Sequence, residues 1–206
     1  CGVGDLSREF RTISFASSCP RNWDDLYAEC TRDVKYLERV HVSLMRGVVR
    51  VRVNHMVKDR LTVDVVTKGA TQTTRNFIAT EMRMEERVLN ITTYWDRDGI
   101  ARGANGFGGG DLALENCPQA LVTVWLPNTT WVSPPGFDIS IGNTEPFGWG
   151  DSPVEWFVPG LVAPIGDVSV ALDGGSLAAL RVYNAVGDVS VADAQMAQLT
   201  VDTSAG

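Results

Sequence analysis

The chain has 206 residues, 44% of them hydrophobic and 21% charged, with a formal net charge of −7 at pH 7, as in a folded globular protein of one large or two small domains. The net charge is negative and the Lys and Arg residues form no basic stripe. We therefore do not expect nucleic acid as a partner, because binding its phosphates requires clustered positive charges. The chain has no apolar run near the roughly 20 residues that cross a bilayer, so we expect no membrane span in it.

The amino-terminal segment, residues 1–35, is predicted to contain disulfide bonds. The four cysteines are Cys1, Cys19, Cys30 and Cys117, and they lack the Cys-x-x-Cys pairs of a metal knuckle. We expect Cys19 and Cys30 to close a short loop and Cys1 and Cys117 to form a second bridge, with four separate buried thiols as the alternative. Disulfides would place the protein in an oxidising compartment. Cys1 is either a lipidated amino terminus or an arbitrary boundary within a longer chain.

Alternating apolar residues predict β-strands from about residue 36 onward. In "VHVSLMRGVVRVRV", Val40–Val53, valines recur at every second position on either side of Gly47, which is typical of strands with one buried face. The stretches "DRLTVDVVTKG", "RVLNITTYW" and "ALVTVWLP" predict longer strands of antiparallel character. A helix is expected at residues 21–30. Residues 75–87 have a helical composition, and an edge strand would explain them equally well.

Two Asn-x-Thr triplets, at Asn90 and Asn128, are predicted glycosylation sites. Together with the cysteines, they favour an extracellular or cell-surface protein.

Residues 128–164 are rich in Pro, Gly and Trp and are predicted to be an irregular insertion with one strand, "FDISIG". Its aromatic side chains include four that we take as candidate partner-binding residues: Trp131, Trp149, Trp156 and Phe147. Such side chains can plug the end of a stack, contact a subunit, or stack on sugar rings. The first two roles are favoured over the third.

The phrase "GDVSVA" occurs twice, at Gly166–Ala171 and Gly187–Ala192, and "LTVDTSAG" restarts it near residue 206. A unit of about twenty residues with two short strands cannot bury its apolar face alone, so neighbouring units must stack. We therefore predict an all-β fold, a β-solenoid-like stack of short strands that also has longer strands and the Pro/Gly/Trp-rich insertion. Val182, Val189 and Val201 should face its interior.

The order of these motifs, from "VHVSLMRGVVRVRV" through "CPQALVTVWLP" to the "L-x-V-x-x-x-x-G-D-V-S-V" units, resembles adhesin-like domains of the DUF4097 and DUF2807 type. The resemblance covers roughly Val40 to Gly206 and implies a β-solenoid with no agreed catalytic residues. The Trp-rich insertion and the cysteine-containing segment depart from the family pattern. The adhesin-like domain would span residues 36–206. It would either continue beyond residue 206 or be covered there by another subunit.

Motifs for catalysis or cofactor binding are weak. His41 and His55 belong to one strand run and lack a metal-binding spacing, and "GANGFGGG" lacks the Lys of a phosphate loop. "DRDG" fails the full calcium-loop pattern. Asp167 and Asp188, one repeat apart, could bind calcium weakly or, more simply, cap their turns. We expect no catalytic residue, no metal and no cofactor.

The sequence therefore predicts a non-enzymatic, extracellular adhesin-like scaffold. Its expected partners are protein subunits, or a second copy that meets it at the end of the stack. The alternative is a carbohydrate-binding or polysaccharide-cleaving β-helix protein, with a glycan as ligand.

Overall fold

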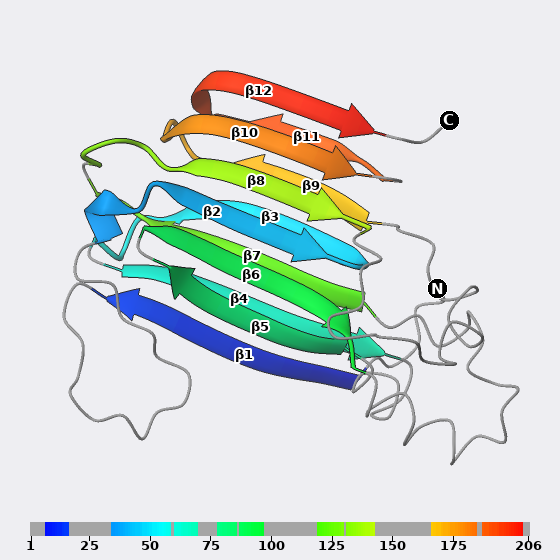
Figure 1. The fold of residues 1–206 in the computed structure, drawn as a ribbon. Helices are drawn as coiled ribbons and strands as arrows, with labels where there is room; N and C mark the ends of the chain where they lie inside the picture. Colours follow the sequence, from blue (N-terminus) through cyan, green and yellow to red (C-terminus); the bar gives the residue numbers. More distant parts are fainter. Residues whose placement is uncertain are drawn as a thin grey trace, which may run out of the picture.

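The computed structural model describes nine stretches of the chain: residues 7–16, 34–58, 60–69, 78–85, 87–96, 119–129, 131–142, 166–184 and 187–203. Within them, twelve β-strands form two six-stranded sheets that lie face to face (Figure 1). The helical structure of these stretches is one short 3-10 helix, η1 (Val34–Tyr36), and none of it is long or apolar enough to cross a membrane. The predicted all-β class is confirmed.

Sheet A has the strand order β1-β4-β7-β3-β9-β11. Its strands are, in that order, β1 (Ser7–Ala16), β4 (Arg60–Gly69), β7 (Gln119–Pro127), β3 (Gly47–Asn54), β9 (Gly166–Ala171) and β11 (Val189–Ala192). Sheet B has the order β12-β10-β8-β2-β6-β5. Its strands are, in that order, β12 (Gln195–Thr203), β10 (Ser176–Asn184), β8 (Gly136–Ile141), β2 (Arg39–Leu44), β6 (Val88–Trp95) and β5 (Ile78–Glu85).

Alternation of apolar and polar residues decides which face of each strand is buried. In β2 and β8 every second side chain is buried and the others are partly or fully exposed, because successive side chains of a strand point to opposite faces of the sheet. The buried ones fill the space between the sheets. The largest that are fully enclosed are Phe137, Leu44, Leu61, Leu89, Ile91, Ile139, Leu172, Leu180 and Val40. Each contributes about 1.5–3 kcal/mol through removal of its surface from water.

Parallel pairing joins strands that are distant in sequence. In sheet B, β6, β2, β8, β10 and β12 are parallel neighbours, and in sheet A, β7, β3, β9 and β11 are. From β8 to β12, consecutive strands alternate between the two sheets. At the other side of the molecule, β4 pairs antiparallel with both β1 and β7, and β5 with β6. Of the three middle strands predicted to be antiparallel, β4 is antiparallel to both of its neighbours, whereas β6 and β7 each have one parallel and one antiparallel neighbour.

The repeated phrases stack in register. Gly47 is the partner of Gly166 across β3 and β9, and the valines of β11 are the partners of those of β9. The side chain of Asp167 accepts a hydrogen bond from the backbone N–H of Asp188 in the next repeat, at 3.0 Å. This aspartate therefore caps the corner of the neighbouring repeat, the simpler of its two predicted roles.

Two elements differ from the sequence-based expectation. Residues 7–16, within the segment predicted to be held by disulfides, form strand β1, which pairs with β4 along its whole length. Residues 78–85 form the edge strand β5, so the helical alternative for 75–87 is wrong there. In β5 the apolar Met82 and Met84 alternate with charged residues and pack on the core. This alternation has the period of a strand.

The strand predicted at "FDISIG" is β8, in the middle of sheet B.

Candidate functional site

The first candidate surface is the edge formed by β11 and β12, where both sheets end on the same side of the molecule. Leu199 of β12 is in register with Leu180 of β10, and Val201 with Val182. Leu180 and Val182 are fully buried, whereas Leu199 is 51% and Val201 43% exposed. Equivalent positions are therefore in the core in β10 and at the surface in β12, the strand of the next repeat.

Sheet A shows the same change on the facing strand. Val191 of β11 is in register with Val170 of β9, yet Val191 is 37% exposed and Val170 is buried. We call the three exposed side chains Val191, Leu199 and Val201 the β11/β12 patch. They point the way their buried partners point, but no described strand covers them. Val182 is buried and Val189 half-buried, as predicted, whereas Val201 points the same way as Val182 but remains partly exposed.

The two edges of sheet B differ in how they are protected. Edge strand β5 carries Glu81, Arg83 and Glu85, and Arg83 pairs with Glu81. Charged side chains discourage further strand pairing at an edge. Edge strand β12, "QMAQLTVDT", has nine residues without Lys, Arg or Pro, and Asp202 is its one charged residue. A long edge strand with so few charges is open to pairing with another chain.

The second candidate surface is a groove at the end of the strands, which we call the end groove. It has a volume of about 370 Å³ and is open to solvent on one side. Three connections form it: those after β3, after β7 and between β9 and β10. Its lining residues are Val53, His55, Leu126, Pro127, Asn128, Thr129, Trp131, Pro134, Leu172, Asp173, Gly174, Gly175 and Ser176.

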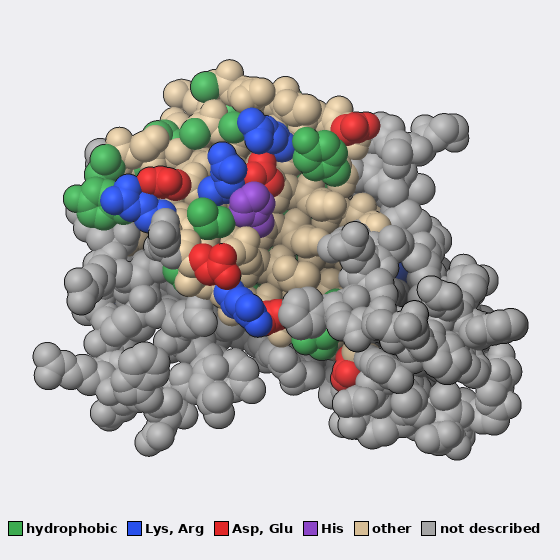
Figure 2. Space-filling view, in the orientation of Figure 1, with side chains coloured by type: hydrophobic (Ala, Val, Ile, Leu, Met, Phe, Trp, Pro, Cys, Tyr) green, Lys and Arg blue, Asp and Glu red, His purple; other side chains and the backbone are tan. Residues whose placement is uncertain are grey.

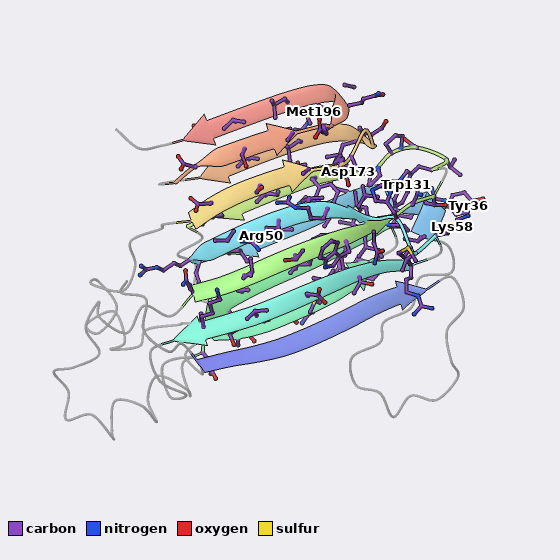
Figure 3. All side chains as sticks on the ribbon, turned by 180° about the vertical axis from the view of Figure 1, so that it is seen from behind. Tyr36, Arg50, Lys58, Trp131, Asp173 and Met196 are labelled. Carbon is purple, nitrogen blue, oxygen red and sulfur yellow. The ribbon has the colours of Figure 1, made fainter. Side chains whose placement is uncertain are left out.

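The end groove has an apolar floor and a polar rim. Trp131 is half-buried and packs against the core cluster, to which Leu126 and Leu172 of the floor belong. Figure 3 shows Trp131 and Asp173 at the same end of the strands. On the rim, Nε2 of His55 lies 2.9 Å from Oδ2 of Asp173, and both side chains are more than half exposed. This pair joins two connections of the rim whose residues are 118 positions apart in the sequence.

A tight turn places Asp173 in the end groove. Asp173 has a φ of 48°, in the left-handed region, which Asp tolerates better than most residues. The backbone N–H of Gly175 donates to the carbonyl of Leu172 at 2.8 Å, and that of Gly174 donates to the carbonyl of Asp193 at 2.7 Å. Asp193, in the next repeat, has a φ of 49°. Two equivalent turns are thus tied together, and only the first lines the groove.

The third candidate surface is a polar cluster on the outer face of sheet B. Figure 2 shows acidic, basic and histidine side chains gathered together there. Asp138 of β8 is at its centre, with Arg39 at 3.6 Å, His41 at 3.5 Å and Arg181 at 4.0 Å. His41 therefore faces outward, as predicted, and pairs with a carboxylate. Within the described stretches, no three His, Cys, Asp or Glu residues are placed to bind a metal ion.

Replacing Asp138 with Asn is expected to lower the free energy of unfolding by about 1–2 kcal/mol at low ionic strength, because each pair contributes up to about 1 kcal/mol. The loss should shrink in about 1 M NaCl, which screens the repulsion left between Arg39 and Arg181. Urea denaturation at the two salt concentrations measures the effect. Asp202→Asn, an exposed change on the same face, is the control and should cost little. Equal losses at both salt concentrations would contradict the electrostatic explanation.

The predicted site residues have different outcomes. Trp131 lies in the end groove, and Asn128 is exposed at its rim. Asn90, on the outer face of β6, is half-buried and in register with His41 of β2. Trp149, Trp156, Phe147 and the four cysteines lie outside the described residues, as does the helix predicted at 21–30. Sequence reasoning missed the His55–Asp173 pair, because no spacing pattern connects two turns so far apart.

Comparison with known proteins gives similarity to solved structures and to no family model or curated protein. The chain is similar to the crystal structure of a "putative cell adhesion protein" from Clostridium sporogenes, at 6% sequence identity and a TM-score of 0.27, over 97% of this chain and 100% of that one. This degree of similarity carries no argument about function. The resemblance to adhesin-like domains of the DUF4097 and DUF2807 type stays a prediction.

Proposed function

We propose that the protein is a non-enzymatic, adhesin-like scaffold outside the cell, which associates with a second copy of itself through the β11/β12 patch. One observation carries the proposal: three side chains are exposed at positions whose in-register partners are core residues. Burying apolar surface is the main driving force of protein association. The extracellular location is supported by the two sequons, of which Asn128 is exposed.

The proposed contact is an antiparallel pairing of the two β12 strands about a two-fold axis. It would pair the outer backbone groups of β12 and cover Leu199 and Val201 in both copies. A two-fold contact uses the same surface twice and closes on itself, so neither β12 strand remains free to pair with a third copy. The strand order supports it, since β12 is the last strand of sheet B.

Acidic residues around the β11/β12 patch give the association a characteristic salt dependence. The described residues 187–203 contain Asp188, Asp193 and Asp202 and no Lys or Arg. Two copies that meet here bring like charges together. Salt screens repulsion between exposed charges, so the dimer should become stronger as ionic strength rises.

Sedimentation velocity over a wide concentration range tests the proposal. The unmodified chain is expected to form dimers, and the double variant Leu199→Lys/Val201→Lys should dimerise at least about tenfold more weakly, a change of about 1.4 kcal/mol. Tyr183→Lys is the matched control, because Tyr183 is 48% exposed on neighbouring β10, on the sheet face opposite to Leu199 and Val201. It should dimerise as the unmodified chain does.

Two outcomes would contradict the proposal. One is a chain that stays monomeric at every concentration and salt strength. The other is a double variant that dimerises as strongly as Tyr183→Lys, which would place the contact elsewhere.

The carbohydrate alternative divides into cleavage and binding. Cleavage of a glycosidic bond ordinarily requires two carboxylates that flank the bond. Among the described residues that line the end groove, Asp173 is the one carboxylate. The groove therefore favours binding over cleavage.

A further inference from the structure

We propose that the end groove binds a neutral sugar, with Trp131 as the stacking surface and the His55–Asp173 pair as hydrogen-bonding partners of its hydroxyl groups. The proposal is independent of the self-association at the β11/β12 patch, because none of the three patch residues lines the groove.

The size of the groove suits a small ligand. Its volume of about 370 Å³ lies at the lower end of the range for small-molecule sites, about 300–1,000 Å³. It is closed below by the core and open on one side. These dimensions favour one or two sugar rings whose remaining chain extends into solvent, and not a ligand enclosed by the protein.

The chemistry of the lining matches the two kinds of surface of a sugar. A sugar ring presents C–H groups on its faces and hydroxyl groups around its perimeter. Trp131, supported from behind by the core, offers a flat apolar surface for a ring face. Around it, the polar groups can both donate and accept: the carboxylate of Asp173 accepts, His55 does either, and Thr129 and Ser176 carry hydroxyls.

The charge of the lining narrows the class of sugar. Its described residues include no Lys or Arg, so no permanent positive charge there balances the negative charge of a phosphate, sulfate or uronate group. The carboxylate of Asp173 would repel such groups. A neutral sugar avoids this repulsion, and a carboxylate can accept hydrogen bonds from two adjacent hydroxyls at once.

The backbone holds Asp173 in place before any ligand arrives. The carbonyl of Asp193 accepts a hydrogen bond from the backbone N–H of Gly174, and the turn is closed by the bond between Gly175 and Leu172. A rigid site loses less conformational entropy on binding than a mobile one. The His55–Asp173 pair is more than half exposed, so it contributes little to folding. Asp173 can therefore be changed without loss of the fold.

The chain offers a matched pair of variants for the test. Asp173 and Asp193 are both exposed and both left-handed, with φ angles of 48° and 49°, and only Asp173 lines the groove. Asn tolerates the left-handed region as Asp does. Asp173→Asn and Asp193→Asn therefore make the same chemical change, one inside the candidate site and one outside it.

The probes are immobilised neutral oligosaccharides of glucose, mannose, galactose and N-acetylglucosamine together with sulfated forms of each, followed by calorimetric titration with the best of the neutral ones. The protein should carry no glycan at Asn128, as verified by its mass, because a glycan there would compete for the groove. We expect the unmodified chain and Asp193→Asn to bind equally, and Asp173→Asn at least about tenfold more weakly, as for a lost hydrogen bond to a charged group. Trp131→Phe, which keeps an aromatic ring against the core, should bind with intermediate affinity.

Three results would overturn the proposal. These are no binding of any of the four sugar classes to the unmodified chain, equal binding by Asp173→Asn and Asp193→Asn, and stronger binding of sulfated than of neutral forms. The Leu199→Lys/Val201→Lys variant separates this site from the proposed dimer contact. It should bind sugar as the unmodified chain does even when it no longer dimerises.

Discussion

Replacing Leu180 with alanine is expected to lower the free energy of unfolding by about 2–5 kcal/mol, as for other fully buried leucines. Leu180 is completely enclosed between the sheets, so its removal leaves a cavity as well as losing apolar burial. Leu199 has the same side chain and is the in-register partner of Leu180 on β12, but half of it is exposed. Leu199→Ala should therefore cost only about 1 kcal/mol.

Urea denaturation followed by tryptophan fluorescence measures both changes. The experiment is done at a protein concentration low enough for the chain to be monomeric, because Leu199 also lies in the proposed dimer contact. If the two substitutions cost the same, Leu199 is covered in the monomer. The β11/β12 patch would then not exist as a free surface.

The second large effect is expected at Gly47, which should not tolerate even a methyl group. Gly47 has a φ of 138°, which side chains rarely adopt, and a Cβ there would overlap the backbone carbonyl of Ala120 on neighbouring β7. Backbone atoms in the middle of a sheet cannot move aside as a flexible side chain can. Gly47→Ala should therefore cost about 3 kcal/mol or more, the sum of backbone strain and overpacking.

Gly136→Ala is the matched control for Gly47→Ala. Gly136 also begins a strand, β8, but a Cβ there would meet its nearest atoms at 3.8 and 3.9 Å, which is ordinary contact. Because alanine restricts the unfolded chain more than glycine does, this change should be neutral or slightly stabilising. Thermal melting of the two variants distinguishes them. Similar melting temperatures would mean that the corner at Gly47 can open without loss of the sheet.

The repeated glycines connect the sequence to the fold. The offsets shared by Val40–Val53 and the later "GDVSVA" phrases predicted that these segments are equivalent, and Gly47 and Gly166 are indeed partners across adjacent strands. A Cβ at Gly187 would overlap the backbone carbonyl of Gly166 in the same way. The sequence pattern was informative here because each strand corner requires the same close approach of its neighbour.

Residues 75–87 show where local pattern was ambiguous. Met82 and Met84 alternate as in a strand, yet Glu, Met and Arg are good helix formers. Residues 78–85 nevertheless form a strand, which pairs with β6 along eight residues. Packing of this strand on the core outweighs differences in helix propensity of a few tenths of a kcal/mol per residue. Strand β1 was missed for a related reason. Its partner β4 is distant in sequence, so the pairing that defines β1 cannot be read from residues 7–16 alone.

The sequence by itself determined the all-β class, the positions of most strands and the side chains that face the core, because alternation of apolar residues follows directly from the geometry of a strand. The tertiary structure alone decided two things. It brought His55 and Asp173 together beside Trp131, since a groove forms from turns that no local pattern connects. It also left Val191, Leu199 and Val201 uncovered, because exposure depends on what lies against a strand and not on the strand's own residues.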